Sequence, residues 1–194
     1  MDKDLEIIEL ELDEANGGIN TIAFVEFPAM ESNFVAFNEH KVEFKTIDED
    51  KRIVVGVALI PNKKIFRKNK GGEYYVTMSE DTVRNVSQLY LKNQNQHSVN
   101  LEHDNHKRVK DCYIVESWIV DNPELDKSVA FGLEAPKGSW VISYKIENEQ
   151  VWSEVKNGTY LGFSIEGFLK PKLNEDEQDN TDKLLNEIIE ILKK

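Results

Sequence analysis

Short apolar segments separated by turn-forming residues recur along most of the chain, and they constrain its fold more than any other feature. The segment IVVGVALI, residues 53–60, is rich in β-branched residues and ends before Pro61, as is typical of a strand buried on both faces. EYYVTM, residues 73–78, predicts another strand. Five more are predicted between residues 97 and 169: HSVNLEH, CYIVESWIVD, KSVAFGLE, SWVISYKI and YLGFSIEGFL.

Helices are predicted at a few points in this series. Thr77 and Glu80 have the spacing of a capping box, and apolar residues follow on one helical face. The segment EQVWSEVKNG, residues 149–158, predicts a second, shorter helix. The expected fold is therefore mainly β with a few helices (α+β). Its sheet is expected to be a closed or strongly curved antiparallel β-barrel, with an added C-terminal helix.

Composition divides the chain into three parts. Residues 1–50 contain short β segments, which belong either to the barrel or to a separate extension. Residues 51–171 form the predicted core. Residues 172–194 combine an acidic linker, NEDEQDN, with an amphipathic helix expected to begin near Thr181.

Charge and composition exclude several classes of protein. The net charge of −12 argues against nucleic acid as the main partner. No apolar stretch approaches the ~20 residues of a membrane span, and the acidic N-terminus is unlike a signal peptide. A single cysteine, Cys112, excludes an internal disulfide framework and a cysteine-based zinc site. We expect a cytoplasmic protein without cofactor, metal or membrane association.

One segment has the opposite charge. Residues 63–70, KKIFRKNK, carry five positive charges and no acid. The segment is either a solvated loop or a docking surface for an acidic partner.

His103 and Ser164 are the candidate pair for chemistry. Strand alternation places His103 on the face of Val99, where a buried core histidine is the alternative interpretation. Ser164 follows Gly162 by two residues, which leaves space above a nucleophilic hydroxyl. The alternative for Ser164 is an outward polar residue of an edge strand. The glycine after it is Gly167, at the third position, so the pattern is not a nucleophile elbow.

Three acids are candidates to orient the imidazole. If a hairpin folds about a turn at residues 105–111, Glu116 falls opposite His103, and it is the predicted third member. Asp104 follows His103 directly but points to the other strand face. Glu166 shares the face of Ser164.

The order VNLEHDN, VESWIVD, GSWV and GFSIEGF, after IVVGVALIP, resembles the prohead serine proteases of tailed phages over roughly residues 50–170. These are similar in fold to the herpesvirus assembly proteases. The resemblance implies a serine endopeptidase that trims scaffold and major capsid proteins, and often itself, inside the assembling prohead in the host cytoplasm. A homodimer is compatible with it. No histidine follows His106, so the third member is an acid or is absent.

Two other functions remain open. A non-catalytic phage structural or scaffold-binding protein could retain the same barrel. A metal-dependent hydrolase could use His97, His103, His106 and Asp104, but His97 and His103 are ~20 Å apart if both lie on one strand.

Overall fold

The computed structural model describes residues 5–13, 17–26, 45–48, 51–69 and 71–172. These residues form three four-stranded sheets. The first sheet has the order β12 (Lys170–Pro171), β1 (Ile7–Glu11), β6 (Gly72–Met78), β5 (Ile65–Asn69). The second has the order β11 (Gly162–Phe168), β2 (Gly18–Val25), β7 (Val99–Leu101), β8 (Asp104–Val109). The third has the order β3 (Lys45–Asp48), β4 (Ile53–Leu59), β10 (Trp140–Ile146), β9 (Cys112–Ile119).

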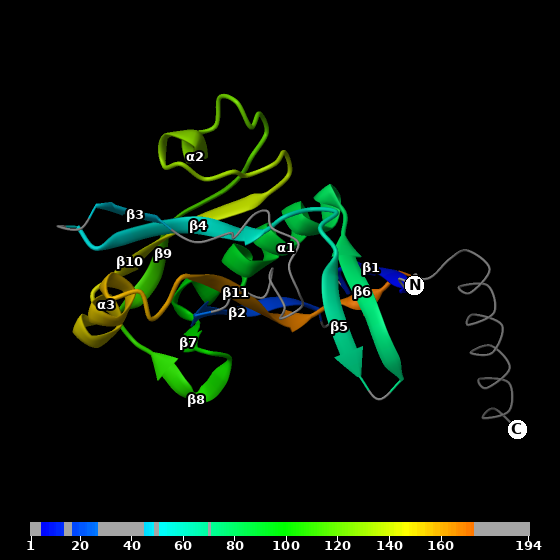
Figure 1. Ribbon diagram of the computed structural model, residues 1–194, viewed down its shortest axis with the longest axis horizontal. Coiled ribbons are helices and arrows are strands. Elements are labelled where there is room, and N and C mark those ends of the chain that lie inside the picture. Colours follow the sequence, from blue (N-terminus) through cyan, green and yellow to red (C-terminus); the bar gives the residue numbers. More distant parts are fainter. Residues whose placement is uncertain (1–4, 14–16, 27–44, 49–50, 70, 173–194) are drawn as a thin grey trace, which may run out of the picture.

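The prediction of a closed antiparallel barrel is wrong. The described strands form open sheets, and the second sheet ends at β11 on one side and β8 on the other. Two pairs are parallel, β1 with β6 and β2 with β7, so strands far apart in sequence lie side by side (Figure 1). Closely spaced strands suggest antiparallel neighbours, but β2 inserts between β11 and β7 instead. The alternation of apolar and polar residues along a strand indicates which side chains share a face. It does not indicate which other strand pairs with it.

The core lies where the second and third sheets face each other. Phe24 of β2, Phe163 of β11 and Tyr144 of β10 pack together with ring centroids 5.2 to 5.5 Å apart. All three side chains are buried. Offset and edge-to-face ring contacts of this kind add to the free energy gained by burial. Aromatic packing on the core side therefore holds the sheet that carries Ser164 in place.

The helices cover the sheets. Helix α1 (Glu80–Lys92) packs against β2, β9 and β10 and buries Val83, Val86 and Tyr90. It is capped by Ser79, whose hydroxyl accepts a hydrogen bond from Thr82 N at 3.1 Å, rather than by the predicted Thr77. The other helices are a 3₁₀ turn, η1 (Asn95–His97), α2 (Lys127–Ala130) and α3 (Glu149–Lys156).

One predicted strand is replaced by a helix and turns. The segment KSVAFGLE begins with α2, which is capped by Asp126 through Ser128 N at 2.8 Å. The indole of Trp118 donates to the same carboxylate at 3.1 Å. These capping bonds favour the helical turn over an extended chain. The predicted C-terminal helix lies outside the described residues.

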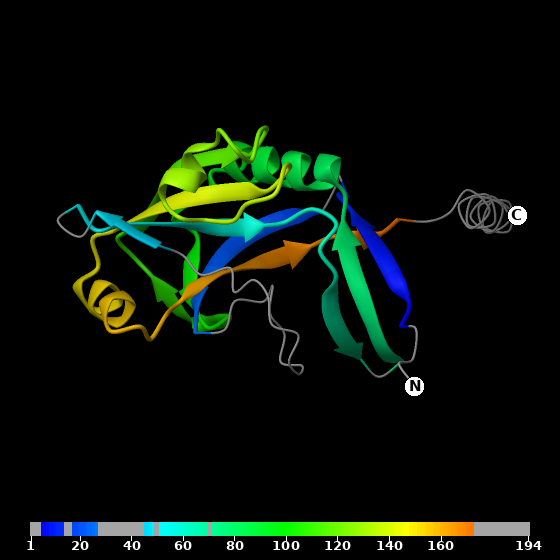
Figure 2. The ribbon, with the colours of Figure 1, turned by 45° about the horizontal axis from the view of Figure 1, so that its top comes forward.

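The first sheet stands at one end of the molecule, beside the ends of β4 and β11 (Figure 2). It includes β1 from the N-terminal part and β12, which directly follows β11 along the chain. Both β5 and β11 are edge strands of their sheets among the described residues.

Candidate active site

Ser164 lies on a row of residues that crosses three strands of the second sheet. Ser164 of β11 is in register with Ala23 of β2, and Ala23 is in register with Asn100 of β7. Residues in register on neighbouring strands share a face. Ser164 is 2% exposed, and Ala23 and Asn100 are fully buried. The small side chain of Ala23 leaves room between the serine and the asparagine.

His103 reaches this row from a tight turn, not from a strand. Glu102 and His103 connect β7 to β8, and their φ angles are +53° and +58°. Positive φ at both central residues is the signature of a type I′ turn. The prediction that His103 lies on the face of Val99 by alternation is therefore wrong. Non-glycine residues seldom adopt this conformation, and such strain concentrates at functional sites.

Two hydrogen bonds attach this turn to the end of β2. The amide of Glu102 donates to the carbonyl oxygen of Phe24 at 3.1 Å. The Glu102 carboxylate accepts a hydrogen bond from the amide of Glu26 at 2.6 Å. Because both anchors hold the residue before His103, they set the position from which the imidazole extends over the sheet.

The imidazole bridges a hydroxyl and a carboxylate. His103 Nε2 is 2.8 Å from Ser164 Oγ, and His103 Nδ1 is 2.8 Å from Glu166 Oε1. The carboxylate accepts a hydrogen bond from a proton on Nδ1, which leaves the lone pair of Nε2 directed at the serine hydroxyl. Asn100 Nδ2 donates to the same carboxylate oxygen at 2.7 Å. The arrangement can take a proton from Ser164 and stabilise the resulting imidazolium.

Sequence comparison agrees with this chemistry. The profile of one protein family, described as "Putative phage serine protease XkdF", matches residues 41–172, about two thirds of the chain. The chain belongs to this family. A search of curated proteins and a search of solved structures each found no match. The expected likeness to the herpesvirus assembly proteases is therefore not confirmed, while membership of a phage serine protease family is.

Glu116 lies in a different sheet from Ser164 and His103. It belongs to β9 of the third sheet, where it accepts hydrogen bonds from Lys127 Nζ at 2.8 Å and Ser143 Oγ at 3.0 Å. The bond from Lys127 is the main reason that the pKa of Glu116 is lowered. The register that placed Glu116 opposite His103 is wrong, because the predicted turn at residues 105–111 is mostly strand β8, which folds back on β7.

The other acid candidates have separate positions. Glu166, on β11, occupies the place beside His103 that was predicted for Glu116. Asp104 Oδ1 accepts a hydrogen bond from the amide of His106 at 2.9 Å. His97 packs its ring against Tyr113 at 5.5 Å between centroids. Within the described ranges, no group of three or more His, Cys, Asp or Glu residues is arranged to hold a metal ion.

Cys112 carries the only thiol of the chain, and a thiol is intrinsically a stronger nucleophile than a hydroxyl. It is 1% exposed, and burial raises the pKa of its thiol to about 12. A thiol in that state holds almost no thiolate at neutral pH. Ser164 is therefore the better candidate nucleophile.

The sequence patterns indicated no role in the site for Asn100 and did not predict the role of Gly167. Asn100 is a lone amide in a short strand, and only the fold brings it to Glu166. Gly167 follows a bulge between Glu166 and Gly167, where β11 passes so close to β2 that an added Cβ would overlap the carbonyl oxygen of Gly18. Gly167 of the GFSIEG segment thus permits the close approach of β11 to β2.

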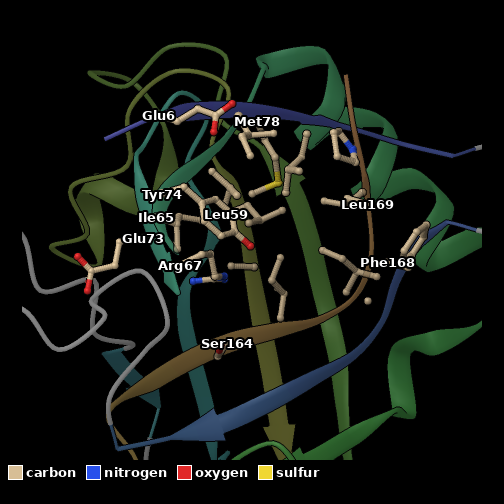
Figure 3. A pocket seen from close by; sticks show the side chains of 18 of the residues that line it. Glu6, Leu59, Ile65, Arg67, Glu73, Tyr74, Met78, Ser164, Phe168 and Leu169 are labelled. Carbon is tan, nitrogen blue, oxygen red and sulfur yellow. The ribbon is translucent and has the colours of Figure 1, made fainter. Parts of the chain in front are cut away.

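A cavity of about 650 Å³ adjoins Ser164. Ser164 lies at one end of it, and the apolar residues of the first sheet and of β4 line its middle (Figure 3). The volume is within the ~300–1,000 Å³ typical of ligand sites. Separately, among the described residues no helix is long and apolar enough to cross a membrane.

Proposed function

We propose that the chain is a serine endopeptidase in which Ser164 is the nucleophile, His103 the general base and Glu166 the residue that orients the imidazole. The observation that carries the proposal is the continuous hydrogen-bonded line from Ser164 through His103 to Glu166, with both links at 2.8 Å. Serine, histidine and carboxylate in this order are recognised by geometry and not by sequence position.

The chemistry follows from the positions of the protons. His103 Nε2 removes the Ser164 proton as Oγ bonds to the carbonyl carbon of the scissile peptide. The imidazolium then gives that proton to the leaving amine, and the C–N bond breaks to leave an acyl ester on Ser164. Water, deprotonated by the same nitrogen, hydrolyses the ester and restores the serine. Glu166 accepts the Nδ1 hydrogen bond throughout and stays ionised.

We also propose that the substrates are the scaffold and major capsid proteins of the assembling prohead in the host cytoplasm. Membership of a phage serine protease family supports this role. The chain itself is a further substrate candidate.

Co-expression with scaffold and capsid proteins tests the proposal. The wild type should trim them, while Ser164→Ala should leave them full-length in assembled shells. Ser139→Ala is a matched control, because Ser139 is also buried and its hydroxyl has no hydrogen-bond partner among the described residues. Trimming by purified Ser164→Ala protein would overturn the nucleophile assignment and favour a non-catalytic structural role.

A further inference from the structure

The cavity next to Ser164 has two chemically different parts. Its middle is apolar, with buried side chains from β4, β5 and β6 that include Leu59, Ile65 and Met78. The end that holds Ser164 also holds Arg67 of β5, which lies between Tyr74 and Ser164 in the view of Figure 3. A carboxylate, Glu6, lies near the opposite end in that view.

Arg67 is available to a ligand. The residue lines the cavity and is exposed, and its guanidinium donates to the carbonyl oxygen of Phe66 at 2.9 Å. No carboxylate among the described residues forms an ion pair with it, whereas Glu73, which also lines the cavity, pairs with Lys68 at 2.9 Å. The surroundings partly desolvate the guanidinium and lower its pKa. A guanidinium that lines a cavity in this way can form a charge-assisted, bidentate pair with an incoming carboxylate.

Arg67 belongs to the basic segment formed by residues 63–70. Residues 63–70 carry five positive charges in a chain of net charge −12. The structure places most of this segment in β5, an edge strand, and not in a loop. A local positive strand on an acidic protein attracts negatively charged partners to that edge.

We propose that this cavity is the specificity pocket of the enzyme and that it selects peptide segments in which an acidic side chain neighbours a large apolar one. The carboxylate pairs with Arg67, and the apolar side chain packs in the middle of the cavity against residues such as Leu59 and Met78. The inference rests on the proposed endopeptidase function, because it makes the cavity a substrate site of Ser164.

Binding to the Ser164→Ala protein separates recognition from cleavage. The probes are fluorescein-labelled peptides of one Gly/Ser-rich sequence with a central Leu-Glu, Leu-Gln, Leu-Lys or Ser-Glu pair, measured by anisotropy at low salt. Leu-Glu should bind roughly tenfold more tightly than Leu-Gln, the factor expected for one charge-assisted hydrogen-bonded pair. Leu-Lys should bind more weakly still, and Ser-Glu more weakly than Leu-Glu.

Variants at Arg67 test whether the preference for the Leu-Glu peptide arises in the cavity. Arg67→Gln in the same background should bind Leu-Glu and Leu-Gln within about twofold of each other, and Arg67→Glu should prefer Leu-Lys. Arg84→Gln is the matched control, because Arg84 pairs with Asp121 at 3.4 Å and does not line the cavity. Equal binding of Leu-Glu, Leu-Gln and Leu-Lys, or a preference that survives Arg67→Gln, would overturn the inference.

A fluorophosphonate probe, applied to the protein that retains Ser164, tests the proposed function separately from the specificity inference. Labelling of Ser164 without a peptide preference would overturn the specificity inference alone. A preference for Leu-Glu without any labelling would support the cavity as an acidic-peptide site and overturn the nucleophile assignment.

Discussion

The second and third sheets each hold a hydrogen-bonded network that contains a serine and a glutamate, and only the network of the second sheet has a histidine between them. In the third sheet, Ser143 donates directly to Glu116, and Lys127 neutralises the carboxylate. In the second sheet, His103 stands between Ser164 and Glu166. A lysine ammonium holds its protons at neutral pH, whereas a neutral imidazole takes and returns one. The histidine, and not the presence of a serine and a glutamate, is what would let the network of the second sheet transfer a proton.

The largest difference between the two networks should appear on removing each serine. Ser164→Ala should lower kcat by about 10⁴-fold or more, because the covalent route is lost, with little change in Tm. Ser143→Ala should keep kcat and reduce the free energy of unfolding by about 1 kcal/mol through the lost hydrogen bond. Peptidase assays and thermal melts on both variants measure this. Equal loss of activity in the two would remove the distinction.

Removing each carboxylate's charge gives the next largest effect. Glu166→Gln should lower kcat by roughly 10²- to 10⁴-fold, because a neutral amide no longer stabilises the imidazolium. Glu116→Gln should leave kcat within about twofold. Steady-state kinetics on purified proteins check this, and a large kcat loss confined to Glu116→Gln would restore the sequence-based prediction for that residue.

At the bulge after Glu166, Gly167 of β11 passes close to the backbone of Gly18 in β2. Gly167→Ala would force a Cβ against the backbone of Gly18 and should cost about 3 kcal/mol of unfolding free energy. Gly132→Ala is the control, with a positive φ and nothing within 4 Å of the added Cβ, and should cost about 1 kcal/mol. Chemical denaturation measures both. Similar costs would show that β11 and β2 separate easily.

The smallest effect concerns acid stability of the third sheet. The folded-state pKa of Glu116 is lowered, so its ion pair stabilises the protein above the ordinary carboxyl pKa and is lost as the pH falls through the lowered value. The side chain is 47% exposed, so the contribution should be below about 1 kcal/mol. Thermal melts from pH 6 to pH 3 should show a slightly shallower decline for Glu116→Gln than for the wild type. A steeper decline would contradict the direction of this shift.

The sequence indicated the parts of the site that depend on local pattern. Alternation along residues 162–168 placed Ser164 and Glu166 on one face, as β11 has them. It failed at His103, because the turn pair Glu102–His103 contains none of the glycine, asparagine or aspartate residues that mark a type I′ turn. Because the sequence shows no sign of the turn at Glu102–His103, the predicted hairpin is centred several residues too late. Glu116 is then predicted at the position beside His103 that Glu166 occupies.

The sheet order depends on contacts that no local pattern encodes. The parallel pairing of β2 with β7 joins residues 77 positions apart and brings Asn100 to Glu166. Where a barrel was expected, the sheet is open among the described residues, because its edge strands β11 and β8 do not pair with each other. Hydrophobic alternation is compatible with either arrangement, since both bury one face of each strand.

The most direct test of the Ser164–His103 assignment is mass-spectrometric mapping of the protein after reaction with a fluorophosphonate. We expect the adduct on Ser164, at a rate that falls by at least about 100-fold in His103→Ala, because the base that activates the hydroxyl is gone. An unmodified Ser164, or labelling at an undiminished rate in His103→Ala, would contradict the claim that these two residues form a nucleophile and its base.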